Sequence, residues 1–363
     1  MGGHISRRNF LSGVVLGATV LGDWAATPAR AGETEAATQW RVKELSFTSD
    51  AAHANPFADV ALTCTFRGPG GAAFTVPGYY DGAGVWRARF TPTAPGSWSY
   101  ATNCPADAQL NGRTGSFAAS EAATGNPLYR DGGFLKVSAN RRFLTYADGT
   151  PFFWLADTWW FCPSSLMPFE GAFRELIDLR RKQGFSVVHM AFLGPLDQSH
   201  GTNSLHDQMR TRRPDLAFWK DVDRYIAYAN DAGILPLIGL AFHTGVDENT
   251  LEDWEFIWRY VMARYGAYAV GWFICGEYNS NAGDAEGRVA KVLALGRFIK
   301  QQDPYRRAMT VHPWWYGGEK RQAWGEDWYD PNPPIRGGLS RLTCGAVLAR
   351  PINMGGGSWG GTP

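Results

Sequence analysis

One acidic side chain, Glu277, directly follows an apolar run, within the segment Gly276-Glu277-Tyr278-Asn279. Other apolar runs carry or end near side chains that exchange protons or bind hydroxyl groups: Asp157, His189, His243 and His312. Indole rings stand beside the first and last of these positions: Trp159, Trp160, Trp314 and Trp315. A carboxyl group can protonate the oxygen of a glycosidic bond, and flat rings can stack on the apolar faces of sugars. These residue types together favour a site that binds and cleaves carbohydrate.

Each of these residues also has a structural interpretation. Glu277 could form an ion pair with a neighbouring Arg, Asp157 could cap the loop that follows it, and the Trp residues could be core. The three His residues could bind a metal ion with Asp157, but the sequence contains neither H-x-H nor H-E-x-x-H. We therefore expect no metal ion and no cofactor. The expected catalytic residue is Glu277, and the expected substrate-binding residues are Asp157, Trp159, Trp160, His189, His243, Asn279, His312 and Trp314.

The elements that position these residues follow from hydrophobic periodicity. Apolar runs predict strands at 152–156, 186–192, 234–242, 270–275 and 308–311, and helical spacing predicts helices at 169–183, 218–232, 251–265 and 288–302. Strands that alternate with helices are parallel and joined by crossovers. The first choice of fold is α/β, a TIM-type (β/α)8 barrel, and the second is a doubly wound open sheet. In a barrel the carboxyl ends of the strands meet at one mouth, which would gather the residues named above.

The length of the chain conflicts with a closed barrel. The five strands begin about 39 residues apart, and only about 50 residues follow the fifth. A barrel ordinarily takes about 250 residues. The tail at 331–363 is irregular and rich in Gly and Pro. We expect a barrel that is incomplete after strand five, from a truncated or frameshifted sequence, and we expect such a chain to be poorly stable and inactive because unpaired strand edges would be exposed.

An all-β unit precedes the barrel. Residues 40 to about 120 contain short strands separated by Gly and Pro turns, which predicts a β-sandwich of immunoglobulin-like type. Two of the five cysteines, Cys64 and Cys104, lie in this unit. They could form one disulfide in an oxidising compartment, or both could be small buried hydrophobic residues.

Composition and the N-terminus restrict partners and location. The 363 residues carry a formal net charge of +1, so a nucleic acid is not an expected partner. Residues 1–31 hold Arg7-Arg8, an apolar run at 11–21 and an A-x-A site at 29–31, which together predict a twin-arginine signal peptide. The apolar run is too short to span a bilayer of about 30 Å. We expect export to the periplasm or the extracellular space without a stable membrane anchor.

Several segments resemble one family, the apiosidase-like glycoside hydrolases. Phe153-Trp-Leu-Ala-Asp-Thr-Trp-Trp160 is similar to that family's F-x-L-G-D-T-x-W opening, and Val270 to Asn279 resembles its W-x-x-x-G-[DE]-x-N fourth strand. His312-Pro313 and Glu326-Asp-Trp-Tyr-Asp330 resemble two later segments. The β-rich module at 40–120 is similar to an immunoglobulin-like domain that often precedes this catalytic domain. The resemblance thus divides the chain into a sandwich at 40–120 and a partial barrel at 126–330.

The resemblance implies a retaining hydrolase that acts on plant-type or other complex glycans. It gives the acid/base role to Glu277 and a nucleophilic role to a Glu after strand seven. The sequence departs from the family pattern after Asp330, and neither Glu319 nor Glu326 stands where the family places its nucleophile. Two rival functions stay open at this point. One is a non-catalytic carbohydrate-binding protein, and the other is a metal-dependent hydrolase.

Overall fold

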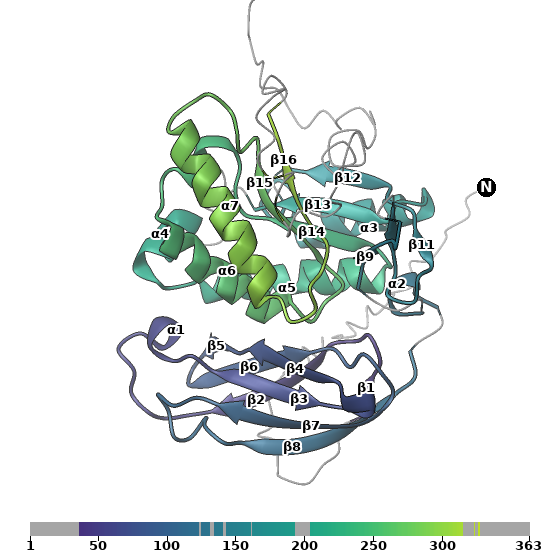
Figure 1. Ribbon diagram of the computed structural model, residues 1–363, viewed down its shortest axis with the longest axis vertical. Helices are drawn as coiled ribbons and strands as arrows, with labels where there is room; N and C mark the ends of the chain where they lie inside the picture. The colour runs from purple at the N-terminus through teal and green to yellow at the C-terminus, as the bar shows by residue number, and fades with distance from the viewer. Residues whose placement is uncertain are drawn as a thin grey trace, which may run out of the picture.

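The computed structural model describes residues 36–122, 125–130, 134–140, 143–160, 162–192, 204–314, 323 and 326. The predicted signal peptide at 1–31 and the predicted tail at 331–363 lie outside these residues. The chain forms a β-sandwich and a mixed α/β unit, shown in Figure 1 with the sandwich below and the α/β unit above.

The sandwich consists of two sheets. One contains, in order, β1 (Ala37–Thr38), β8 (Thr114–Ser120), β7 (Gly96–Asn103), β3 (Thr63–Arg67) and β4 (Ala73–Pro77). The other contains β2 (Lys43–Thr48), β6 (Val85–Phe90) and β5 (Tyr79–Gly82). The neighbouring strands are antiparallel, apart from the short β1–β8 pair. Phe66 and Phe90 stack between the sheets with ring centroids 4.1 Å apart. The all-β prediction is confirmed, and its immunoglobulin-like type stays a prediction.

Cys64 and Cys104 are both buried as free thiols in this core. Burial raises the pKa of Cys64 to about 12 and also raises the pKa of Cys104. Of the two interpretations that the sequence left open, the structure therefore has the small buried hydrophobic residues and not the disulfide.

A small connecting unit joins the two larger ones. It contains α2 (Pro127–Arg130) and an antiparallel sheet of β9 (Lys136–Val137), β10 (Leu144–Thr145) and β11 (Pro151–Phe152). The run at 152–156, predicted as the first parallel strand, is divided in the structure. Phe152 belongs to β11, Phe153 is 75% exposed, and the first parallel strand is β12 (Ala156–Trp159). The prediction placed this strand too early, because an apolar run alone does not show which neighbour a backbone pairs with.

The parallel sheet has the order β12, β13 (Val187–Ala191), β14 (Leu235–Gly239), β15 (Gly271–Gly276) and β16 (Met309–His312). All four pairings are parallel, as predicted. The connections contain α3 (Arg174–Lys182) after an irregular turn η2 (Phe169–Phe173), then α4 (Leu205–Thr211), α5 (Leu216–Asp231), η4 (His243–Val246), α6 (Leu251–Tyr265) and α7 (Ala285–Gln302). The four predicted helices are present, and α4 is an additional one.

The helices cover one face of this sheet. Side chains such as Ile238, Trp272 and Val311 share a core with residues of α3, α5, α6 and α7. The opposite face, with Val187, Leu237 and Phe273, packs against the small sheet of β9, β10 and β11. A doubly wound sheet carries helices on both faces, whereas a barrel wall carries them on one. Helices on one face agree with the first choice of fold, and the barrel itself stays a prediction.

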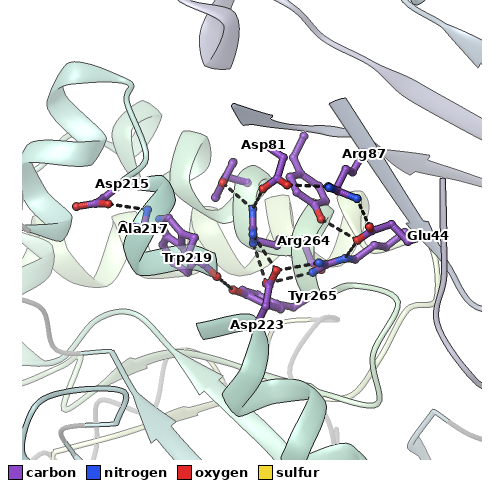
Figure 2. Close-up of polar contacts among 12 residues, drawn as sticks. Glu44, Asp81, Arg87, Asp215, Ala217, Trp219, Asp223, Arg264 and Tyr265 are labelled. Atoms are coloured by element: carbon purple, nitrogen blue, oxygen red, sulfur yellow. Dashed lines mark hydrogen bonds and ion pairs between the residues drawn. The ribbon is translucent and has the colours of Figure 1, made fainter. Parts of the chain in front are cut away.

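The sandwich joins the α/β unit through buried ion pairs (Figure 2). The Arg264 side chain of α6 is 1% exposed and contacts both carboxylate oxygens of Asp223 at 2.8 Å and one oxygen of Asp81 at 3.0 Å. Arg89 of β6 also contacts Asp223, at 2.9 Å, and Glu44, at 2.7 Å. These pairs satisfy charges that would otherwise be costly to bury, and they fix the sandwich against α5 and α6.

Candidate active site

Glu277 lies where β15 ends and the chain turns sharply. Gly276 forms a bridge with Phe242 of the neighbouring connection, and a side chain at Gly276 would collide with the Phe242 ring. The next residue, Glu277, has a φ of 50°, in the left-handed region that a residue with a side chain seldom adopts. The close approach explains the glycine, and the left-handed residue turns the backbone out of the line of the strand.

The Glu277 carboxyl group is partly buried. Burial raises its pKa above the ordinary value, because desolvation disfavours the charged form. Among the residues that the structure describes, no Arg or Lys forms an ion pair with it. The structural interpretation of Glu277 as a partner of a neighbouring Arg therefore has no support, and its environment suits a group that must hold a proton before donating it.

The ends of the adjacent strands bring three predicted residues towards this loop. Asn279 is buried, and its side-chain oxygen accepts a hydrogen bond of 2.6 Å from the backbone nitrogen of Trp314. The Trp314 ring lies 5.9 Å from the ring of His243. His243, like Glu277, has a left-handed φ, at 53°. The structure thus brings His243, Asn279 and Trp314 together around the carboxyl ends of β14, β15 and β16.

Two further predicted His residues lie deeper, on the face of the sheet opposite the helices. His189 is 2% exposed, and its ring lies 4.2 Å from the ring of Phe273. Burial first, and the charge of His312 second, lower the pKa of His189 to about 3. Burial also lowers the pKa of His312. Burial therefore favours the neutral form of both rings. The Nε2 atom of His189 has no hydrogen-bond partner among the described residues.

Phe242 links these groups, although its residue type did not mark it as a candidate in the sequence. Its ring lies 4.9 Å from Trp160 and 6.5 Å from His312. Trp160 is 37% exposed and lies 6.0 Å from His189. We call the group of Trp160, His189, Phe242 and His312 the aromatic floor. It extends from the sheet to the region of Glu277. The only available signal for Phe242 was its position at the end of a predicted strand, directly before His243.

Asp157 and Trp159 lie elsewhere. The Asp157 carboxylate accepts hydrogen bonds from Arg180 of α3 at 2.6 Å and from the Trp159 indole at 3.0 Å. Trp159 is buried in the core that the sheet shares with the helices. Because alternate side chains of a strand point to opposite faces, both residues of β12 face α3. The structure therefore does not bring Asp157 or Trp159 to Glu277, and they hold β12 to α3.

Trp315 and Glu319 lie outside the described residues. Glu326 forms an ion pair with Arg297 of α7, with 2.8 Å between Arg297 Nε and a carboxylate oxygen. Within the described part of the chain, no three His, Cys, Asp or Glu side chains are grouped to hold a metal ion. No helix in that part is long and apolar enough to cross a membrane.

Comparison with known families identifies both units. Residues 138–333 match the model of the apiosidase-like catalytic domain, and residues 36–105 match a domain of unknown function, DUF5060. The first match covers more than half of the chain. The chain therefore belongs to the apiosidase-like family, which agrees with the resemblance of its strand-end motifs.

The structure is also similar to solved structures of glycoside hydrolases. A candidate glycoside hydrolase from Bacteroides vulgatus is 24% identical, with a TM-score of 0.62 over 77% of this chain and 56% of that chain. A family 5 glycoside hydrolase from the same species is 22% identical, with a TM-score of 0.46 over 57% of this chain and 45% of that one. The first likeness shows the fold alone, and the second is too weak for an argument. The chain spans just over half the length of the first. A search of curated proteins finds no match.

Proposed function

We propose that the chain acts as a glycoside hydrolase with Glu277 as its general acid and base, and hydrolysis by this chain would overturn the expectation that an incomplete barrel is inactive. The observation that carries the proposal is the partly buried Glu277 carboxyl group at the carboxyl end of β15, whose pKa burial raises. Membership of the apiosidase-like family supports a carbohydrate substrate, and we propose plant-type or other complex glycans as its class.

In the proposed reaction, Glu277 protonates the oxygen of the leaving sugar. A second carboxylate, to which we assign no residue, would attack the anomeric carbon as its bond to the protonated leaving oxygen breaks, and a glycosyl-enzyme would form. Glu277 then removes a proton from water, and the water oxygen attacks the same carbon with retention of configuration. His243 and Asn279 would bind hydroxyl groups, and Trp160 and Trp314 would stack on sugar rings.

The experiment is hydrolysis of a panel of aryl glycosides by the wild type, Glu277→Gln and Glu326→Gln. Gln keeps the shape of the side chain and removes its acidity. The proposal is supported if E277Q no longer releases the aryl group and E326Q still does. Glu326 serves as the control because it is bound to Arg297 on α7. Equal activity of the wild type and E277Q would contradict it.

A second candidate function is carbohydrate binding without cleavage. The aromatic floor favours it, since these neutral rings need no second carboxylate to hold a sugar. Titration calorimetry with oligosaccharides separates the two functions. Binding that Trp160→Ala weakens, without product in any assay of the wild type, would favour the binding protein.

We also propose that residues 1–31 direct export by the twin-arginine route to the periplasm or the extracellular space. The support is the sequence alone, with Arg7-Arg8 before an apolar run. Cell fractionation of the chain with Arg7 and Arg8 both changed to Lys tests it. Export that continues unchanged in this variant would contradict the route.

A further inference from the structure

Arg288 binds the backbone of the loop that follows Glu277. It lies in the first turn of α7 and is completely buried. Its Nε atom donates to the carbonyl oxygen of Tyr278 at 2.9 Å, and Nη2 donates to the carbonyl oxygens of Ser280 and Ala282 at 2.6 and 2.8 Å. One guanidinium group therefore holds three carbonyl groups within five residues of Glu277.

The same guanidinium group also binds the neighbouring loop. Its Nη1 atom contacts the Asp247 carboxylate at 2.7 Å, and Asp247 directly follows η4, which begins at His243. The two loops pack closely there, since a Cβ atom at Gly283 would lie 2.7 Å from the Asp247 carboxylate. Arg288 thus joins the loop of His243 to the loop of Glu277.

Both joined loops contain a residue in a costly conformation. Glu277 and His243 have left-handed φ values of 50° and 53°. Such a backbone persists only where the surroundings hold it. The planar fork of an Arg can bind several fixed acceptors at once, which the single ammonium group of Lys cannot do in the same geometry.

We propose that Arg288 is a positioning residue that holds the Glu277 and His243 loops in register and keeps the Glu277 carboxyl group in its partly buried place. The effect on catalysis rests on the proposed function, whereas the effect on the position of Glu277 does not. The titratable and charged groups around these loops are Cys275 on β15, His243, Asp247 and Glu248 after β14, Asp284 and Lys291 of α7, and His312 on β16. Burial lowers the pKa of His243, and the charge of Arg288 lowers it further, whereas Asp247 raises it.

The direction of one pKa change tests the proposal. If Arg288 holds the loop, Arg288→Gln releases the Glu277 carboxyl group towards water, and its raised pKa falls towards the ordinary value. If Arg288 acts only through its charge, removing that charge raises the pKa of Glu277 instead. Carbon-13 NMR titration of glutamate-labelled protein measures this pKa, with the Glu277 signal assigned by its loss in E277Q.

Arg288→Lys keeps the charge and loses the fork, so we expect the pKa of Glu277 to fall in this variant as well. Asp247→Asn keeps the carbonyl contacts of Arg288 and weakens only its contact to the His243 loop. We therefore expect a smaller fall in the pKa of Glu277. Asp247 is partly exposed, which favours correct folding of this variant if the Arg288 variants do not fold. An unchanged or raised pKa of Glu277 in all folded variants would overturn the proposal.

Arg264→Gln is the matched control. Arg264 is as deeply buried and as fully bonded as Arg288, but it joins the sandwich to the α/β unit. We expect R264Q to lower stability without moving the pKa of Glu277. A fall in R264Q as large as in R288Q would show a general loosening and overturn a specific role.

Activity gives the second readout. We expect kcat for an aryl glycoside to fall about 100-fold in R288K and R288Q, because small displacements of a catalytic group are costly, while KM changes little. The alkaline limb of the pH profile should move to lower pH together with the Glu277 signal. If the wild type hydrolyses no glycoside, the proposed function fails, and the NMR titration still tests the positioning role.

Discussion

The two faces of the parallel sheet carry the same kinds of side chain in different roles. On the helix side, Asp157 and Trp159 bind each other and Arg180, so a carboxylate and an indole hold β12 to α3. On the other side and at the strand ends, Glu277 has no ion-pair partner among the described residues, and Trp160 is 37% exposed. The type of residue therefore does not decide its role. Its role depends on its position in the sheet and on the side chains that it contacts there.

The largest expected effect separates the two carboxylates. Glu277→Gln should lower kcat for an aryl glycoside by about 100-fold to 10,000-fold, the usual range for loss of a general acid. Asp157→Asn should change kcat by less than about threefold, because its carboxylate is directed towards α3. Steady-state kinetics measures both, and an equal loss of activity in the two variants would remove the distinction between the faces.

For stability we expect the opposite order, with the larger loss in the Asp157 variant. Asp157→Ala leaves Arg180, itself mostly buried, without its carboxylate partner, and we expect the free energy of unfolding to fall by about 2 kcal/mol. Glu277→Ala removes no ion pair and should change it by less than about 0.5 kcal/mol. Urea unfolding followed by tryptophan fluorescence measures the change. A Glu277 variant as unstable as the Asp157 variant would argue for a structural Glu277.

His189 predicts how stability depends on pH. Its pKa is lowered from 6.5 to about 3, so below pH 6.5 the unfolded chain binds a proton that the folded chain refuses. The contribution of this residue to stability is therefore present above pH 6.5 and is lost as the pH falls towards 3, at up to about 1.4 kcal/mol per pH unit. His189→Asn should lose less stability than the wild type between pH 7 and pH 5. Unfolding curves that shift equally with pH in both proteins would show that His189 titrates normally.

The smallest effect compares the two adjacent indoles. Trp160→Ala should weaken oligosaccharide binding about tenfold and leave stability nearly unchanged, because the ring is partly exposed. Trp159→Ala should lower stability and leave oligosaccharide binding nearly unchanged, since its ring is buried in the core. Calorimetric titration and thermal unfolding of both variants give the comparison, which fails if Trp159→Ala alone weakens binding.

The sequence predicted the order of the five parallel strands and the place of Glu277, because continuous apolar runs mark strands that are buried on both faces. It did not predict the direction of Asp157. The predicted strand ended before Asp157, whereas β12 includes it, and a residue within a strand is directed to one face of the sheet and not to the mouth at the strand end. Phe242 and Arg288 were also missed, since their roles arise from contacts between segments far apart in the sequence.

The ion pairs between the sandwich and the α/β unit have a consequence for the response of the protein to ionic strength. At physiological concentration, dissolved salt screens the interaction of exposed charges more than about 8 Å apart, and it affects buried pairs much less. The Arg264 side chain is 1% exposed, so the attraction that orients the sandwich is largely hidden from ions in solution. Small-angle scattering profiles should therefore coincide in dilute buffer and in concentrated brine.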